Sequence, residues 1–190
     1  MEYILMLIGA VLVNNIILAQ FLGVNPFLRI SNNISTAAGM SLAVIFVLPL
    51  STLITLLLQN YILLPLNISF LQTISFILII VALVQILKIV IKKTSLVLFQ
   101  KSRLYIPLIT TNSAVLGVAI LVTQSNLTLI DSVLYSIFTA IGFVVVIIIF
   151  AGIREQMELS NVPKGMKGVP ISLITAGILA MAFMGFANLA

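Results

Sequence analysis

Long apolar runs alternate with short polar joins along almost the whole chain of 190 residues. A bilayer core about 30 Å thick needs about 20 apolar residues in a helix, and runs of this length recur six times. The joins are short and contain turn-forming residues, as in Leu64-Pro65-Leu66-Asn67. The pattern therefore predicts a single all-α integral membrane domain, residues 1–190, with six transmembrane helices. The expected spans are Tyr3–Leu22, Thr36–Leu58, Phe70–Ile91, Leu104–Thr123, Asp131–Gly152 and Pro170–Leu189.

Composition supports the membrane interpretation and excludes several kinds of chemistry. The chain is 62% hydrophobic and 7% charged, which is far too few charges to cover the surface of a soluble domain. It contains no cysteine and no histidine, so disulfides, thiolate metal sites and histidine proton carriers are excluded. No basic segment precedes the first apolar run, so we expect a retained helix. A complete catalytic site in this chain alone is not expected.

The charged residues predict one orientation in the membrane. All nine Lys and Arg residues end or follow the first, third and fifth spans, and in a six-helix chain these joins share one face. Short loops rich in Lys and Arg stay in the cytoplasm, so both termini are expected on the outer face. The nine residues are Arg29, Lys88, Lys92, Lys93, Lys101, Arg103, Arg154, Lys164 and Lys167.

A mixed charge cluster follows the fifth span and has two interpretations. Pairing of Arg154 with Glu158 at i,i+4 would extend the fifth helix into water. Alternatively, Arg154, Glu155 and Glu158 form a docking surface for a partner.

Two uncharged polar clusters interrupt the apolar spans. Asn14 and Asn15 lie in the first span, and the block from Thr110 to Ser113 lies in the fourth. Amides buried in hydrocarbon without partners cost several kcal/mol, so these groups must bind other helices, water or an ion. One cluster in the first helix of each three-helix half favours a 3+3 inverted-topology repeat with a site between the halves. Glycines and prolines flank both clusters, which predicts that the first and fourth helices are broken. The flanking residues are Gly23, Pro26, Pro107 and Gly117.

Several strings in these segments resemble the A-type membrane subunits of the Rnf electron-transport complexes. The strings are Val11-Leu12-Val13-Asn14-Asn15, Phe21-Leu22-Gly23, Leu108-Ile109-Thr110-Thr111-Asn112, Ala114-Val115-Leu116-Gly117-Val118-Ala119, Ala151-Gly152-Ile153-Arg154-Glu155 and Leu173-Ile174-Thr175-Ala176-Gly177. The resemblance implies a six-helix subunit of the bacterial plasma (inner) membrane. It also implies a translocase that passes electrons between ferredoxin and NAD through flavins and iron–sulfur clusters, coupled to movement of Na⁺ or H⁺. Such a subunit pairs with a homologous E-type subunit in inverted orientation, and the pair holds a two-iron (2Fe–2S) cluster.

The family's two cluster cysteines correspond to Asn25 and Ser113 in this chain. An amide and a hydroxyl are poor substitutes for the thiolates that hold iron–sulfur clusters. We therefore expect this chain to hold no cofactor, with flavins and clusters in partner subunits. A natural cluster-free variant, engineered replacement of the cysteines and a divergent ion-binding homologue all remain open.

Helix geometry also bears on these positions. Asn25 would lie about 16 Å along a straight helix from Asn14, so the first helix must break. We expect a half-helix that ends near Asn25 and faces the break beside Ser113.

The preferred interpretation is a membrane subunit of an ion-translocating electron-transport complex. Its polar residues would line the electron or ion path or hold the broken helices; they are Asn14, Asn15, Thr110, Thr111 and Asn112. The alternative is a small inverted-repeat secondary transporter for an ion or solute. A passive assembly factor, in which these residues only join helices, is a third possibility.

Overall fold

The computed structural model describes residues 2–94, 105–125 and 127–186, and every regular element in these ranges is helical. Four helical segments are long and apolar enough to cross a membrane, and two shorter apolar helices accompany them. The predicted all-α, multi-pass architecture is therefore confirmed. The long segments are Ile34–Leu63, Ser69–Lys93, Ile106–Gln124 and Leu129–Glu158, and the short helices are Glu2–Val13 and Val169–Met184.

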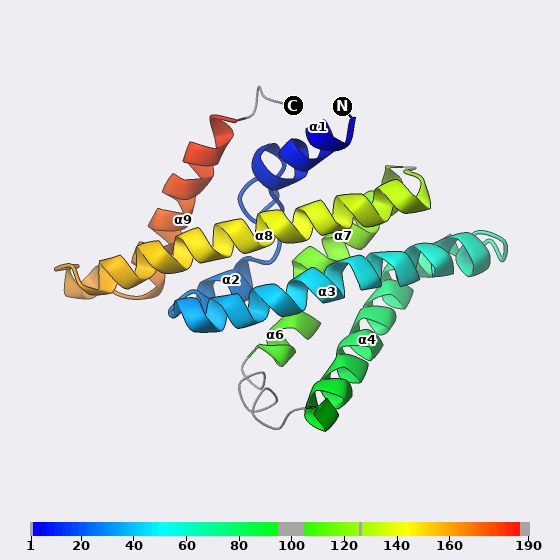
Figure 1. The fold of residues 1–190 in the computed structure, drawn as a ribbon, viewed down its shortest axis with the longest axis horizontal. Helices are drawn as coiled ribbons and strands as arrows, with labels where there is room; N and C mark the ends of the chain where they lie inside the picture. Colours follow the sequence, from blue (N-terminus) through cyan, green and yellow to red (C-terminus); the bar gives the residue numbers. More distant parts are fainter. Residues whose placement is uncertain (1, 95–104, 126, 187–190) are drawn as a thin grey trace.

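Two long helices form the centre of the molecule. Helix α3 (Ile34–Leu58), which continues as the π-helical turn η2 (Gln59–Leu63), packs antiparallel to α8 (Leu129–Glu158) (Figure 1). Phe143 and Phe150 of α8 and Met40 and Val44 of α3 are fully buried. Small residues also face the interior, including Ala37, Ser41, Ala140 and Ala151. Close approach of small residues is the usual basis of helix packing in membranes.

The outer helices pack in a reciprocal pattern on this central pair. Helix α4 (Gln72–Thr94), preceded by the turn η3 (Ser69–Leu71), contacts two helices from the second half of the chain, α6 (Ile106–Thr110) and α7 (Ser113–Gln124). Helix α9 (Val169–Met184) diverges to the opposite side and contacts the first helical segment (Figure 1). In the same way, α3 contacts α6 and α7, while α8 contacts the first helical segment. Each half of the chain thus packs against the first helix of the other half.

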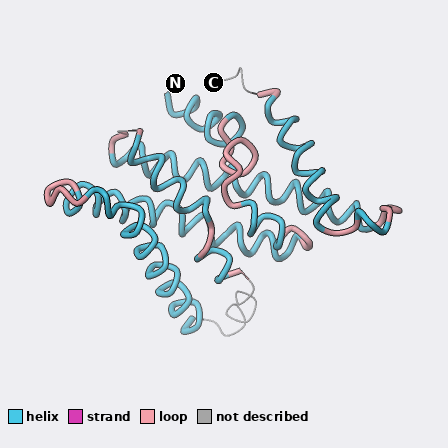
Figure 2. The backbone as a smooth tube through the Cα atoms, turned by 180° about the vertical axis from the view of Figure 1, so that it is seen from behind, coloured by secondary structure: helices cyan, strands magenta, loops and turns pink. Residues whose placement is uncertain are grey.

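Both helices that carry polar clusters are interrupted, as the sequence predicts. The first helical segment comprises α1 (Glu2–Ile8) and the π-helical turn η1 (Gly9–Val13), and helix resumes only at α2 (Val24–Ile30). The fourth consists of α6 (Ile106–Thr110) and α7 (Ser113–Gln124). Figure 2 shows the first interruption as a long loop beneath the N-terminal helix.

Two details of the expected first helix are wrong. The helix that begins the chain ends at Val13 and does not continue to Leu22, because the Asn15 side chain bonds to the backbone in its place. The half-helix beside Asn25 begins there, at Val24, and does not end there. Its N-cap, Gly23, has a φ of 77°, which an α-helix does not include.

The other helix boundaries lie closer to those expected from the sequence. Helix α8 extends to Glu158, six residues beyond Gly152, and α9 ends at Met184. Leu104, Lys101, Arg103 and Leu189 lie outside the described residues.

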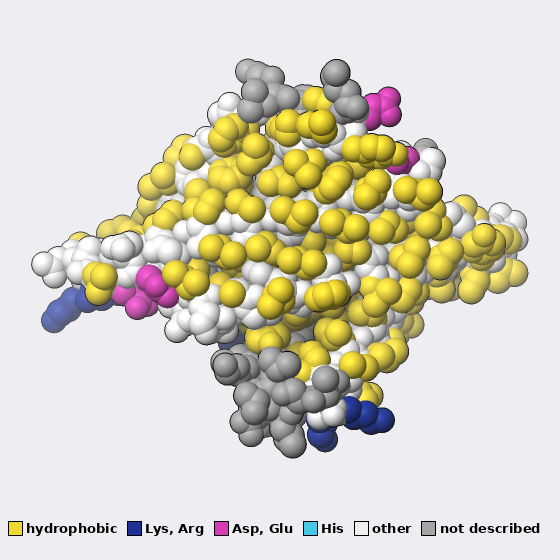
Figure 3. Space-filling view, viewed as in Figure 1, with side chains coloured by type: hydrophobic (Ala, Val, Ile, Leu, Met, Phe, Trp, Pro, Cys, Tyr) yellow, Lys and Arg dark blue, Asp and Glu magenta, His cyan; other side chains and the backbone are white. Residues whose placement is uncertain are grey.

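The exterior is largely apolar, as expected for a chain in lipid. Large side chains such as Phe46 and Ile178 are exposed near the middle of the helices. In the face drawn in Figure 3, Lys and Arg side chains gather at the left end and at the bottom. The start of α1 and the end of α9 both lie at the top of the view in Figure 1.

Candidate functional site

Asn15 organises the first interruption. Its side chain is fully buried, its Nδ2 donates to the carbonyl of Val11 (2.8 Å), and its Oδ1 accepts from the N–H groups of Ile17 (3.1 Å) and Leu18 (3.4 Å). One amide thereby satisfies three backbone groups that the end of the helix would leave unpaired. Asn14, by contrast, is exposed at the C-cap of η1, where its own N–H donates to Gly9.

The first interruption ends in two residues with left-handed backbone. Phe21 has a φ of 55° and Gly23 a φ of 77°. A positive φ is rare for an aromatic residue and is held only where the surrounding structure fixes it. The Phe21 side chain is also exposed. This turn redirects the chain so that α2 starts at a new angle.

Asn112 organises the second interruption in a similar way. It is the N-cap of α7, where its Oδ1 accepts from the N–H of Ala114 at 3.0 Å. The residue is 3% exposed, yet its Nδ2 has no hydrogen-bond partner. Thr110 and Thr111 donate their hydroxyls to the carbonyls of Ile106 and Pro107, one turn earlier in α6.

The two interruptions meet at Gly23. Its N–H donates to Ser113 Oγ (2.8 Å), which joins the start of α2 to the start of α7 across 90 residues. A Cβ on Gly23 would lie 2.8 Å from Asn112 Oδ1 and 3.1 Å from the Cβ of Ala114. Only glycine therefore satisfies both the backbone angle and the space. The expectation that the break near Asn25 faces the one near Ser113 is confirmed.

Helix α8 packs against the first interruption and the point where it meets the second. A Cβ on Gly142 would lie 3.0 Å from Asn15 Nδ2, and the ring of Phe143 lies 3.3 Å from the position of a Cβ on Gly23. These two neighbouring residues of α8 thus hold the first break and the meeting point together. The sequence around Gly142 is an apolar run and does not indicate that this residue contacts the first break.

The site has a buried layer and an exposed layer. Asn15 and Asn112 are buried, whereas Asn25, Thr111 and Ser113 are exposed, as is Asn14, and Thr110 is half-buried. Helix N-termini carry partial positive charge, and two of them converge beside the exposed group. Exposed polar groups of this kind are costly where they face lipid.

The donor groups present do not fit a two-iron cluster. The whole chain has no cysteine, and Asn25 and Ser113 supply only an amide and a hydroxyl. Iron–sulfur clusters require thiolates, with imidazole as the known exception in one class. In addition, Ser113 Oγ already accepts a hydrogen bond from Gly23. No group of three or more metal-ligating acidic, His or Cys side chains occurs within the described residues.

Arg154 and Glu155 join α8 to the first half of the chain. Arg154 Nη1 donates to the carbonyl of Leu28 and to Ser31 Oγ (2.8 Å), at the end of α2. Its guanidinium also lies 6.0 Å from the ring centroid of Phe150, which stacks on Phe27 of α2. Glu155 Oε1 accepts from the N–H of Ile34 (3.0 Å) at the start of α3.

These contacts bear on the two interpretations of the charge cluster. In the described part of the chain, no ion pair joins Arg154 to Glu158, although α8 does continue to that residue. Both Arg154 and Glu155 instead hold the join between α2 and α3. Sequence reasoning missed this role because the contacts span more than 120 residues.

Comparison with known proteins identifies the family. The model of the family described as "Rnf-Nqr subunit, membrane protein" matches residues 3–190. The chain is 49% identical over 189 residues to the A subunit of the Na⁺-translocating ferredoxin:NAD⁺ oxidoreductase complex of Acetobacterium woodii, covering 100% of this chain and 98% of the relative. It is 48% identical over 188 residues to the A subunit of the ion-translocating oxidoreductase complex of Pseudoalteromonas translucida, covering 99% and 97%.

A third relative, the A subunit of the ion-translocating oxidoreductase complex of Vibrio cholerae, is 47% identical over 188 residues, covering 99% of this chain and 98% of the relative. Broken apolar helices with a polar meeting point, together with these matches, define a membrane subunit of the ion-translocating oxidoreductase type. The chain belongs to the Rnf-Nqr family of membrane subunits. The resemblance to A-type subunits seen in the sequence is confirmed by the names of these relatives.

Proposed function

We propose that this chain is the subunit of an Rnf-type complex that builds half of the intramembrane electron or ion path. The observation that carries the proposal is the hydrogen bond from Gly23 to Ser113, which joins two half-helix N-termini beside exposed polar residues. The complex would couple ferredoxin:NAD oxidoreduction to ion movement, as the name of the Acetobacterium relative states for that protein. The chain would not be catalytic alone.

The complete topology is part of this proposal. The chain would cross the bacterial inner membrane six times as a 3+3 inverted repeat, with the first span formed by α1, η1 and α2 together. Reciprocal packing supports the repeat, since α3 contacts α6 and α7 while α8 contacts α1 and η1. The basic joins would face the cytoplasm and both termini the outside.

The exposed polar surface at Asn25, Thr111 and Ser113 would be covered by a homologous E-type six-helix subunit. An inverted homologue presents an equivalent pair of half-helix ends, so polar groups would meet polar groups at the interface and lipid would be excluded. The other redox subunits would dock on the cytoplasmic joins.

The buried asparagines would preserve the shape of the path. Asn15 and Asn112 would hold the broken helices, and the unpaired Nδ2 of Asn112 would donate to a group that arrives at the interface. Thr110 and Thr111 offer hydroxyl oxygens that suit a hard cation such as Na⁺. Asn25 and Ser113 would mark the family's cluster position without holding iron, and flavins and clusters would reside in partner subunits.

A purification tests the proposal. The chain would be tagged in its native host and purified in mild detergent, its companions would be identified by mass spectrometry, and iron and acid-labile sulfide would be measured. We expect a homologous six-helix subunit, flavin-bearing subunits, and less iron than one membrane cluster per pair. Recovery of the chain alone, with uptake of a solute by the chain alone in liposomes, would favour the secondary transporter and overturn the proposal.

A cross-linking experiment tests the interface itself. The chain is free of cysteine, so Ser113→Cys introduces a single reactive thiol. This thiol should cross-link to the E-type subunit, whereas Ile178→Cys, exposed on α9, should not. Equal cross-linking from both positions would contradict the proposed interface.

A further inference from the structure

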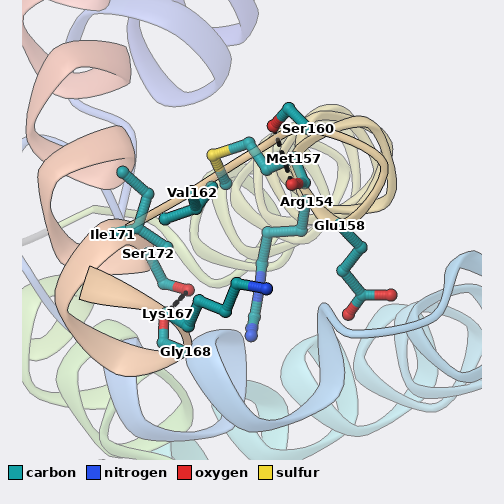
Figure 4. Close-up of a pocket in the computed structure, with 9 residues that line it drawn as sticks. All are labelled: Arg154, Met157, Glu158, Ser160, Val162, Lys167, Gly168, Ile171 and Ser172. Carbon is teal, nitrogen blue, oxygen red and sulfur yellow. Dashed lines mark hydrogen bonds between the residues drawn. The ribbon is translucent and has the colours of Figure 1, made fainter. Parts of the chain in front are cut away.

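A cleft opens where α8 ends and the chain turns into α9. Its volume is about 270 Å³, and the cationic side chains of Arg154 and Lys167 line it (Figure 4). Lys167 comes from the loop before α9, and Arg154 comes from the last turns of α8. Neither Gly23 nor Ser113 lines this cleft.

The charges in the cleft favour an anion. Figure 4 shows Lys167 extending toward Arg154, while the carboxylate of Glu158 points away from both. Among the described residues, Lys167 has neither a hydrogen bond nor an ion pair. With two cations and one carboxylate, the lining of the cleft has a net positive charge. Two cations that face one space repel each other, and an anion between them removes this repulsion.

Donor groups remain available on both sides of the cleft. Arg154 uses Nη1 for Leu28 and Ser31, which leaves the N–H groups of Nε and Nη2 for another acceptor. Helix α9, 16 residues long, starts beside the cleft at Val169, and its positive end adds to the field of the two cations. The hydroxyls of Ser160 and Ser172 already donate to backbone carbonyls, so they supply no proton to the cleft.

An apolar strip leads away from the cleft along α9. Ile171 lines the cleft, and Ile174, Ile178 and Met181 follow on the same helix face at 46%, 57% and 64% exposure. Helices α8 and α9 diverge above this point (Figure 1), and the strip is exposed along its length. Thr175 Oγ1 donates to Sδ of the lining residue Met157 (3.2 Å), which ties α9 to α8 beside the cleft. A charged head and an apolar tail would therefore be bound side by side.

We propose that this cleft binds one anionic phospholipid. The phosphate lies between Arg154 and Lys167, and an acyl chain follows the strip from Ile171 toward Met181. Basic pockets between transmembrane helices on the cytoplasmic side bind anionic lipid headgroups in other membrane proteins. Because Arg154 also holds the end of α2, the bound lipid braces the join between α2 and α3.

Native mass spectrometry of the complete purified complex tests the inference. The complex would be delipidated and titrated with phosphatidylglycerol or with phosphatidylcholine of the same acyl chains. We expect phosphatidylglycerol to bind more tightly, and Lys167→Gln to weaken it about fivefold, as for loss of one basic residue near a membrane surface. Lys167→Arg should restore binding. Lys164→Gln is the matched control, because it removes the same charge from the same loop outside the cleft lining.

Four outcomes would overturn the inference. Equal binding of the two lipids shows no headgroup selection, and an equal effect of Lys164→Gln and Lys167→Gln shows only diffuse surface charge. Displacement by inorganic phosphate at the lipid's own concentration identifies a free-anion site. A carbodiimide cross-link from Lys167 to another subunit, with no lipid bound, identifies a protein contact. The assay requires an assembled complex but no electron transfer, so its failure is distinct from failure of the proposed redox role.

Discussion

Each of the two helix breaks frees backbone groups that need new hydrogen-bond partners, and the two breaks provide these partners differently. The first extends over ten residues, 14–23, and includes left-handed backbone at Phe21 and Gly23. The second takes only Thr111 and Asn112, and neither has a positive φ. An asparagine bonds to the freed backbone in both, but Asn15 makes three hydrogen bonds and Asn112 makes one.

This difference indicates a division of roles. The first break is stabilised from within its own segment, because both polar atoms of the Asn15 side chain bond to backbone groups there. The second retains unused hydrogen-bonding capacity, since the buried Nδ2 of Asn112 has no partner in the described chain. A buried donor without a partner costs free energy until something binds it. We therefore expect the first break to govern stability and the second to govern binding.

Substitution of Gly23 should have the largest effect, because both breaks depend on it. Gly23→Ala adds a Cβ at a φ of 77° and within 2.8 Å of Asn112 Oδ1. We expect a loss of about 4 kcal/mol, combining left-handed strain with overpacking. The measurement is the free energy of unfolding in mixed detergent micelles, together with the yield of assembled complex.

Gly152→Ala is the control for this substitution. Position 152 lies in α8 with nothing within 4 Å of an added Cβ, so the change should be neutral or stabilising by up to about 1 kcal/mol. If both alanine variants unfold alike, the tight meeting at Gly23 is wrong.

Replacement of each asparagine in turn tests directly whether the first break governs stability and the second governs binding. Asn15→Leu leaves one carbonyl and two N–H groups unpaired in a buried site, and we expect a cost of about 3 kcal/mol. Asn112→Leu loses one cap and should cost about 1 kcal/mol. Unfolding free energies give the stability difference, and coupled ion transport by the reconstituted complex gives the functional one.

The asparagine variants also test the path. Asn112→Leu should reduce coupled transport more than its small stability cost accounts for. Normal assembly with wild-type transport in both variants would refute a role for these residues in the path and favour simple joining of helices.

Removal of the Arg154 contacts should weaken the join between α2 and α3 and leave the second break unaffected, because both bonded groups, in Leu28 and Ser31, lie at the end of α2. Arg154→Met keeps much of the side-chain volume but loses the bonds to Leu28 and Ser31, and we expect about 1.5 kcal/mol of destabilisation. Thermal unfolding of the complex measures it. Glu158→Gln removes a charge one turn further along α8, on a side chain that makes none of the hydrogen bonds to α2 and whose carboxylate points away from Arg154 (Figure 4), and should leave the midpoint unchanged. An equal loss in both variants would show that the effect comes from the change in charge and not from the lost hydrogen bonds of Arg154.

The two breaks were predictable because they depend on residues that are neighbours in the sequence. The contacts that hold them in place were not, because they join residues that are far apart in the chain. Pairs of polar residues flanked by glycine and proline predict interruption, and both interruptions occur. The length of the first break was not predictable, because no local pattern places Phe21 in left-handed backbone. The contacts of Gly142 with Asn15 and of Arg154 with Leu28 each join distant segments, and an apolar run does not indicate which neighbour it faces.

Ser113→Ala should have the smallest effect on stability. It removes the acceptor for the Gly23 N–H, and because Ser113 is exposed the cost should be about 1 kcal/mol or less. Ser113→Thr keeps a hydroxyl and should behave as wild type in unfolding. If Ser113 also faces a homologous subunit, Ser113→Ala should weaken copurification of that subunit more than it lowers the unfolding free energy of the isolated chain. A stability loss with unchanged copurification would leave Ser113 as an internal contact between the two breaks and would place the partner's surface elsewhere.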